Sequence, residues 1–306
     1  MTPVAVLITI ASYFLILFTI SYIAGRKADN EGFFVGNRKS AWYVVAFAMI
    51  GSSISGVTFV SVPGMVGISN FSYLQMVLGF VTGQIIIAFV LIPLFYRMNL
   101  VSIYEYLENR FGTSSYKTGA WFFFISKILG AAVRLYLVCL TLQLLVFEPF
   151  HMPFIMNVIL TVALVWLYTF RGGVKSLIWT DSLKTFCLIV SVVLCIYYIS
   201  TDLKLSFTEM FSTVSDSALS HMFFFDNVND KRYFFKQFLA GVFTMIAMTG
   251  LDQDMMQRNL SCKNFKDSQK NMITSGISQF FIILLFLMLG VLLYTFTSHQ
   301  GITNPA

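Results

Sequence analysis

The chain has 306 residues, of which 57% are hydrophobic and only 11% are charged. A typical soluble domain has about 25% charged residues, so this composition favours a protein that crosses a membrane several times. The formal net charge of +6 does not indicate nucleic-acid binding, because the basic residues lie between apolar runs instead of clustering on one face. The four cysteines form no CxxC pair, so we expect free thiols, with neither disulfides nor a metal site.

Eight segments are apolar over roughly the length that a membrane-spanning helix needs, about 20 residues. In chain order they are Pro3–Ala24, Trp42–Gly67, Tyr73–Tyr96, Thr118–Phe147, Pro153–Phe170, Asp181–Thr201, Phe234–Met256 and Met272–Thr297. We therefore predict a single all-α, polytopic transmembrane domain over residues 1–306, with residues 202–233 as an extracytoplasmic loop. The first segment has no basic residues before it, and Arg26 and Lys27 follow it, so we interpret it as a retained span and not as a signal peptide.

The distribution of Lys and Arg predicts the orientation, since cytoplasmic loops are enriched in these residues. Every second loop is basic, and together these loops hold 13 of the 20 basic residues: Arg26, Lys27, Arg38, Lys39, Arg97, Arg110, Lys117, Arg171, Lys175, Arg258, Lys263, Lys266 and Lys270. The opposite loops hold four, all in or beside residues 202–236. We expect the protein in the cell (inner) membrane, with the basic loops on the cytoplasmic side and both ends of the chain on the outer side.

Three basic residues lie within predicted spans, where a charge costs at least about 2.5–3.5 kcal/mol on insertion scales. Lys184 is one turn into the sixth span and can extend towards the basic side. Lys127 and Arg134 are seven residues apart on the fourth span and share a helix face. Arg134 lies near the middle of that span, so it is a candidate functional residue. For Lys127 we expect a structural role.

The second span contains an unusual stretch, AMIGSSISGVTFVSVPGMVG, from Ala48 to Gly67. Its hydroxyl groups and glycines weaken a helix in lipid, which supplies no replacement hydrogen bonds. Broken helices persist at membrane depth only where they face protein or a water-filled cavity, and transporters use such breaks as binding sites. The stretch therefore predicts a broken helix beside a cavity. The alternative is that the small residues only allow close helix packing.

This stretch, which ends in Pro63-Gly64, resembles the sodium/solute symporter family, which includes the proline, galactose, sialic acid and pantothenate carriers. Three further segments are similar to family motifs: SIYEYLENRFG (102–112), FRGGVKSLIWTDSLKTF (170–186) and GLDQDMMQRNLSCKNFKDSQK (250–270). The resemblance runs along the whole chain. It implies a five-plus-five inverted-repeat fold preceded by one extra helix, with a second repeat that is incomplete here. The helix that would complete the family's sodium site is not among these residues, so either the chain is a fragment or it does not bind sodium in the family's way.

The resemblance also implies roles for residues of the second span. It places sodium-coordinating backbone carbonyls at Gly51 and Ile54, and it places Ser53, Ser55 and Thr58 towards the solute. In the proline carriers an aspartate occupies the position of Ser53, which argues against a proline-type substrate.

Two further positions have a family interpretation and an ordinary alternative. Asp181 is an acidic residue for a second sodium site or for coupling, or else it caps the N-terminus of the sixth span. Arg134 binds a substrate carboxylate with help from Gln75, as an arginine does in the sialic acid branch, or else it forms an internal ion pair with Asp181 or binds backbone carbonyls.

The resemblance also implies that the seventh span is the counterpart of the second in the inverted repeat. Its Gly241, Thr244, Thr249 and Gly250 are therefore expected to line the same cavity. Polar and charged side chains follow at its end: Asp252, Gln253, Gln257 and Arg258. They form either a gate or ordinary interfacial anchors.

We predict a sodium-coupled symporter that moves a small polar, possibly anionic, solute into the cell by alternating access. Sodium is the expected coupling ion, and the solute and the lipid bilayer are the expected partners, with no nucleic acid and no obligate protein partner. We do not expect an enzyme, because the sequence offers no candidate nucleophile together with a general base that would activate it, and no nucleotide-binding loop. The alternative function is a transporter-like sensory or regulatory membrane module.

Overall fold

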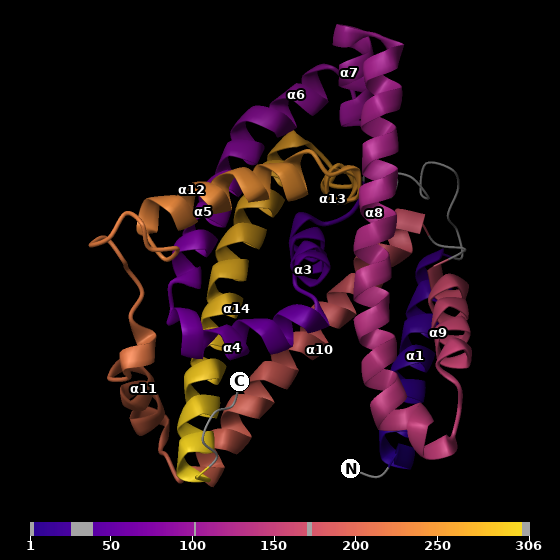
Figure 1. Ribbon diagram of the computed structural model, residues 1–306. Coiled ribbons are helices and arrows are strands. Elements are labelled where there is room, and N and C mark those ends of the chain that lie inside the picture. Colours follow the sequence, from indigo (N-terminus) through magenta and orange to yellow (C-terminus); the bar gives the residue numbers. More distant parts are fainter. Residues whose placement is uncertain (1–2, 26–38, 101, 170–172, 302–306) are drawn as a thin grey trace.

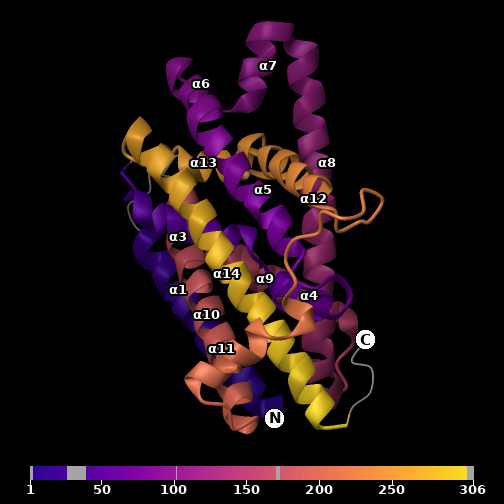
Figure 2. The same cartoon turned by 90° about the vertical axis from the view of Figure 1, so that its left-hand side faces the viewer.

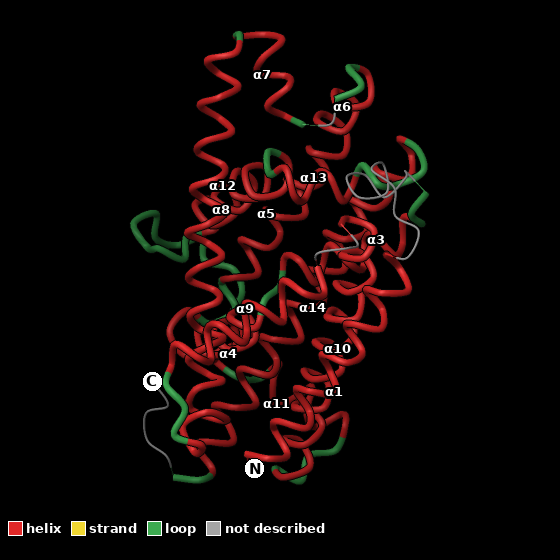
Figure 3. The backbone as a smooth tube through the Cα atoms, turned by 90° about the vertical axis from the view of Figure 1, so that its right-hand side faces the viewer, coloured by secondary structure: helices red, strands yellow, loops and turns green. Residues whose placement is uncertain are grey.

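A computed structural model describes residues 3–25, 39–100, 102–169 and 173–301, and Figure 3 shows helices and loops but no strand in these ranges. The helices are α1 (Pro3–Gly25), α3 (Trp42–Ser53), α4 (Gly56–Ser69), α5 (Tyr73–Ile86), η2 (Ile87–Leu91), α6 (Ile92–Arg97), α7 (Ile103–Phe111), α8 (Thr113–Leu142), η3 (Gln143–Phe147), η4 (Glu148–Phe150), α9 (Phe154–Thr169), α10 (Gly173–Asp202), α11 (Phe207–Ser215), η5 (Ala218–Ser220), α12 (Phe234–Met245), η6 (Ile246–Gly250), α13 (Gln253–Asn259) and α14 (Phe265–His299).

Five of the helical stretches among the described residues are long and apolar enough to cross a membrane, and two bent pairs raise the number to seven. The bent pairs are α3 with α4, and α12–η6 with α13. The protein is therefore a multi-pass membrane protein. Its two bent pairs fall in the second and seventh predicted spans.

The first break, between α3 and α4, bends the chain by 65°. Ile54 and Ser55 have extended backbone angles, with ψ of 124° and 170°. In a continuous helix the Ser55 amide would donate to the Gly51 carbonyl, but here it donates to Thr58 Oγ1 at 3.2 Å. The Thr58 hydroxyl therefore accepts from an amide at the start of α4, and the Gly51 carbonyl at the end of α3 is left without its helical donor. The small polar residues of this stretch predicted such a break.

The second break, after η6, bends the chain by 73°. Asp252 is the N-cap residue of α13, and its carboxylate accepts a hydrogen bond from the Met255 amide at 3.2 Å. The acidic residue thus stabilises the start of a short helix within the seventh predicted span.

Glycines bring the broken helices close to their neighbours. A Cβ at Gly51 would overlap the Thr185 hydroxyl of α10, and a Cβ at Gly241 would overlap the Met76 carbonyl of α5. The Thr185 hydroxyl also donates to the Phe47 carbonyl at 2.8 Å, which joins α10 to α3. Small residues thus allow the backbones to approach, as is common between membrane helices.

Helix α14 runs between the two halves of the bundle, with α5 on one side and α10 on the other (Figures 1 and 2). It contacts α3, α4, α5 and α10, and most of its buried side chains are apolar. Helix α1 lies apart from this centre, against α9 and α10. The two breaks therefore lie on a core that α14 and α10 support.

One sequence interpretation is wrong. Asp181 does not cap a helix, because α10 begins at Gly173 and Asp181 lies about two turns inside it. Helices α8 and α14 also begin before the predicted spans, at Thr113 and Phe265, since amphipathic turns extend them past the apolar segment.

Candidate functional site

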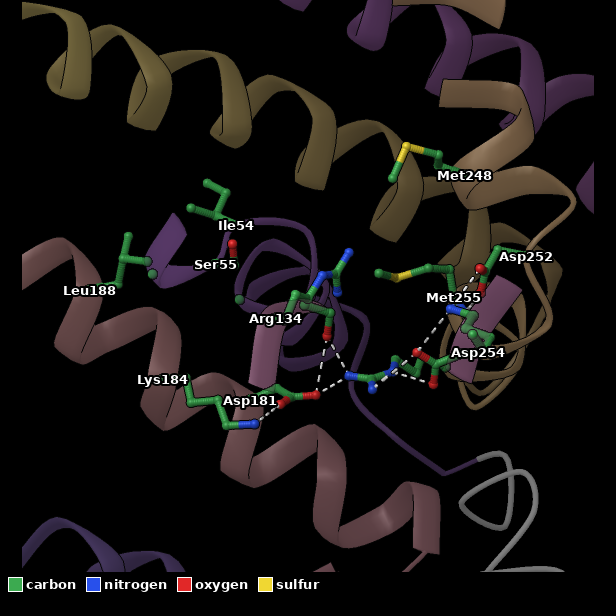
Figure 4. A pocket seen from close by; sticks show the side chains of 15 residues that line it. Ile54, Ser55, Arg134, Asp181, Lys184, Leu188, Met248, Asp252, Asp254 and Met255 are labelled. Atoms are coloured by element: carbon green, nitrogen blue, oxygen red, sulfur yellow. Dashed lines mark hydrogen bonds and ion pairs between the residues drawn. The ribbon is translucent and has the colours of Figure 1, made fainter. Parts of the chain in front are cut away.

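A cavity of about 440 Å³ lies between the two helix breaks, α8 and α10 (Figure 4). Four basic and three acidic side chains line it: Lys127, Arg134, Lys184, Arg258, Asp181, Asp252 and Asp254. The first break contributes Gly51 and Ile54 to the wall. A charged cavity of this kind inside a membrane domain is the first place to look for function.

A smaller cavity of about 170 Å³ adjoins it. The two share residues from both breaks and from α8: Ser52, Ile54, Arg134, Met248 and Met255. Aromatic and aliphatic side chains such as Phe80 line much of the smaller cavity. Its polar groups include the hydroxyls of Tyr73 and Thr249 and the amide of Gln279. A mainly apolar wall with a few polar groups is typical of a small-molecule site.

Asp181 is the centre of one charged cluster on the larger cavity, and only 3% of the residue is exposed. Its carboxylate pairs with Lys184 Nζ at 2.9 Å and accepts a hydrogen bond from the Ser52 hydroxyl at 3.1 Å. The Arg258 guanidinium contacts both the Asp181 carboxylate and Ser52 (Figure 4). Helices α3, α10 and α13 are thus joined by one buried carboxylate.

Lys127 is the centre of a second charged cluster. Its Nζ lies 2.7 Å from Asp252 Oδ2 and 3.9 Å from Asp254 Oδ2, which joins the middle of α8 to the start of α13. Asp254 also pairs with Arg258 Nε at 3.2 Å. The two clusters meet at Asp254, so ion pairs connect α13 to α8 and α10, and the hydrogen bond between Arg258 and Ser52 connects it to α3.

Arg134 differs from the other basic residues of the cavity. It lines both cavities, and in Figure 4 its guanidinium lies between Ile54 and Met248. Among the described residues it makes no hydrogen bond and no ion pair, whereas Lys127, Lys184 and Arg258 each pair with a carboxylate. The suggested pair between Arg134 and Asp181 is therefore not formed, and among the four described basic residues that line the larger cavity Arg134 is the one without a carboxylate partner.

The remaining residues expected from sequence fall into two groups. Ser55 lines the larger cavity, Ser53 and Thr58 line the smaller one, and Ser53 also donates to the Met49 carbonyl at 2.9 Å. Gln75 is elsewhere: it is fully buried, donates to the Arg232 carbonyl at 2.8 Å and accepts from the Phe224 amide at 3.2 Å. Its amide holds a loop in place and does not reach these two cavities.

Sequence reasoning missed a pair of glutamines. Gln84 of α5 donates to Gln279 Oε1 of α14 at 3.4 Å and accepts from Ser275 at 3.3 Å. Among the described residues the Gln279 amide nitrogen has no partner, and Gln279 lines the smaller cavity. Two amides within apolar runs are a signal that could have identified them, because polar residues in spans are costly.

Arg258 was also left undecided by the sequence, between a gate and an interfacial anchor. Only 7% of it is exposed, and it binds Asp181, Ser52 and Asp254. An interfacial anchor would extend into headgroups and water, so that interpretation is wrong for Arg258.

The sequence was compared with known proteins. A model of the sodium:solute symporter family matches residues 33–305. The sodium/sialic acid symporter NanT of Aliivibrio fischeri is 26% identical over 293 residues, which are 91% of this chain and 55% of that protein. Human sodium-coupled monocarboxylate transporter 2 is 25% identical over 272 residues, 88% of this chain and 43% of that protein. The chain thus spans about half the length of these relatives.

The fold was compared with solved structures. The substrate-bound, outward-open structure of a sodium-coupled sialic acid symporter superimposes with a TM-score of 0.83, at 21% sequence identity. The match covers 96% of this chain and 62% of that one. The predicted transporter fold with an incomplete second repeat is therefore confirmed. Together with the family model, which matches most of the sequence, these findings establish that the chain belongs to the sodium:solute symporter family.

Proposed function

We propose that the native protein is a sodium-coupled symporter for a small anionic solute whose carboxylate binds Arg134. The free guanidinium between the two cavities is the observation on which this rests. Seven charged residues line the larger cavity, four basic and three acidic, which leaves one positive charge over. An anionic solute would neutralise it, and a guanidinium binds a carboxylate through two parallel hydrogen bonds.

The smaller cavity holds the rest of the solute in this proposal. Tyr73, Phe80 and Met245 contact its apolar part, and the free amide nitrogen of Gln279 donates to a carbonyl or hydroxyl oxygen. The named relatives of this chain transport sialic acid and monocarboxylates, which supports an anion. A neutral sugar or amino acid is the alternative solute, and it would leave Arg134 without a counter-charge.

Sodium is placed at the first break in this proposal. The carbonyl of Gly51 has lost its usual helical donor, and unwound backbone offers the oxygen ligands that a hard cation needs. Ile54 lies three residues further on, where the backbone is extended. Asp181 is the candidate acidic ligand of a second sodium site, where the ion would displace Lys184 or Arg258 from the carboxylate.

The two ion-pair clusters act as a gate in this proposal. They join α13 to α3, α8 and α10, so a solute leaving past α13 must break the pair between Lys127 and Asp252. The basic loops predict that the end of the bundle at α13 lies on the cytoplasmic side of the cell membrane and that Met1 lies on the outer side. Rocking of the core around the site would then give alternating access.

Uptake of labelled solutes into proteoliposomes containing the native protein tests the proposal. The panel holds short monocarboxylates, sugar acids, neutral sugars and amino acids, each with and without an inward sodium gradient. We expect sodium-dependent uptake of at least one carboxylate, lost in Arg134→Ala and partly kept in Arg134→Lys. Sodium-independent uptake, or an unchanged rate for Arg134→Ala, would overturn the assignment.

A further inference from the structure

Two glutamines, Gln84 of α5 and Gln279 of α14, lie next to each other inside the bundle. Only 3% of Gln84 and 7% of Gln279 are exposed. Helix α5 packs against both α12 and α14 (Figures 1 and 2), and a Cβ at Gly276 of α14 would overlap the Gln84 side chain. Described helices therefore form the surroundings of the Gln84 amide.

Met245 of α12 determines which end of the Gln84 amide carries the nitrogen. The two ends of an amide have nearly the same shape, so their hydrogen-bond partners identify them. A thioether sulfur has no proton and can only accept, and Met245 Sδ lies 3.5 Å from Gln84 Nε2. At the other end the Ser275 hydroxyl donates to Gln84 Oε1 at 3.3 Å. The Gln84 nitrogen therefore faces Met245, and the oxygen faces Ser275.

The Gln84 nitrogen in turn orients the Gln279 amide. Gln84 Nε2 donates to Gln279 Oε1 at 3.4 Å. The reverse orientation of Gln279 would place two amide nitrogens, which can only donate, against each other. Because Gln279 lines the smaller cavity and its oxygen is bound to Gln84, its nitrogen is the end that remains for the cavity.

The charges of the smaller cavity agree with a hydrogen-bond donor at this position. Among the described residues that line this cavity there is an arginine, Arg134, but no aspartate or glutamate. An ammonium group here would meet donors and would find no carboxylate to compensate its charge, which is costly away from water. A solute oxygen would instead accept a hydrogen bond from the Gln279 amide.

From these observations we propose that Gln84 is a positioning residue for solute recognition. It holds the Gln279 amide with its nitrogen towards the smaller cavity, so that this wall binds a solute oxygen and disfavours an ammonium group. The inference rests on the proposed function, in which the solute fills this cavity. It narrows the solute to a carboxylate that carries a further oxygen acceptor, such as an oxo, hydroxyl or acetamido group, and no free amine.

Exchange of side-chain amide protons with water tests the orientation without any solute. The native protein is labelled with ¹⁵N in its glutamine side chains, and Gln279→Glu and Gln75→Met identify two of the signals. Gln75 is the internal reference, because its nitrogen donates to the carbonyls of both Ser72 and Arg232. We expect the Gln279 protons to exchange several-fold faster than those of Gln75. Equal or slower exchange at Gln279 would overturn the proposal, because its nitrogen would then be the bound end.

Affinities for two matched acids test the consequence for selectivity. 2-Oxobutyrate and 2-aminobutyrate share a carboxylate and a carbon skeleton, and they differ in carrying an oxygen or an ammonium group. We expect the native protein, with sodium, to bind the oxo acid about 10-fold more tightly, the upper factor for one ordinary hydrogen bond. Gln84→Met removes the donor, so the Gln279 amide can turn, and the preference should fall to within about 2-fold.

Gln84→Glu should reverse the preference, because a carboxylate can only accept and the Gln279 nitrogen would turn towards it. Gln269→Glu is the matched control, since it adds the same charge to α14 at a position that lines neither cavity. Gln269 donates to the Ala88 carbonyl at 2.9 Å, and its variant should keep the native preference.

An unchanged preference in both Gln84 variants would overturn the proposal, since a purely structural role would weaken the binding of both acids equally. A reversal in Gln269→Glu would also overturn it, because the added charge alone would then explain the effect. Failure of the proposed function is a separate result: Arg134→Ala would leave the affinity for 2-oxobutyrate unchanged, or neither acid would bind. In that case, or if the Gln84 variants do not fold, the exchange rates still decide the orientation of Gln279.

Discussion

A double-mutant cycle on Asp181 and Arg258 measures the buried ion pair that joins α10 to α13. Their side chains are 5% and 9% exposed. Removing one partner of a buried pair costs about 3–5 kcal/mol, because it leaves a charge without compensation. Each residue keeps a second partner here, Lys184 for Asp181 and Asp254 for Arg258, so the lower limit applies. We expect Asp181→Asn and Arg258→Gln each to lower the free energy of unfolding by about 3 kcal/mol.

The double variant is expected to cost less than the sum of the single variants, with a coupling energy of about 2–3 kcal/mol. Unfolding by SDS titration in mixed micelles, followed by circular dichroism, gives all four free energies. Asp202→Asn is the matched control: it removes an exposed carboxylate from the end of α10, and a change within about 0.5 kcal/mol is expected. A coupling energy below about 0.5 kcal/mol would refute the ion pair as a structural link between these helices.

Three other changes test further parts of the structure. Gly241→Ala places a methyl group on the Met76 carbonyl and is expected to destabilise the α5–α12 contact by about 1–3 kcal/mol in the same titration, whereas Gly130→Ala, where a methyl meets open space, should not destabilise the protein. Lys127→Glu should slow uptake at least several-fold by repelling Asp252, and adding Asp252→Lys should restore part of the rate; no rescue would argue against a pair that gates. Cys262 is fully buried, and burial raises the pKa of its thiol to about 12, so it should resist maleimide at pH 8 and react after unfolding in SDS; rapid labelling of the folded protein would contradict its burial.

The sequence was most informative where a residue type is energetically unfavourable at its position within a membrane span. Hydroxyls and glycines between Ala48 and Gly67 indicated the first break, and the backbone at Ile54 and Ser55 is indeed extended. An arginine in the middle of a span identified Arg134, which the structure places on both cavities. Both signals arise because lipid offers no compensation for polar groups.

Partners across the bundle were harder to predict. Asp181 was considered for a helix cap because it opens the sixth predicted span and Asp favours that position, but residues 173–180 continue the helix back to Gly173. Gln75 resembled a substrate ligand because of its place on the third span, yet it holds a loop 149 residues away. Pairings at such separations depend on how helices pack, which one sequence does not reveal.

Equilibrium binding tests the central claim most directly, since symport requires that sodium and the solute strengthen each other's binding. Calorimetry of the native protein in detergent would measure the affinity for the transported carboxylate with and without sodium, and the affinity for sodium with and without the carboxylate. We predict that both affinities rise by the same factor, about 5- to 150-fold for a typical coupling energy. We also predict that Arg134→Ala removes this increase. A carboxylate affinity that is equal with and without sodium would contradict the account.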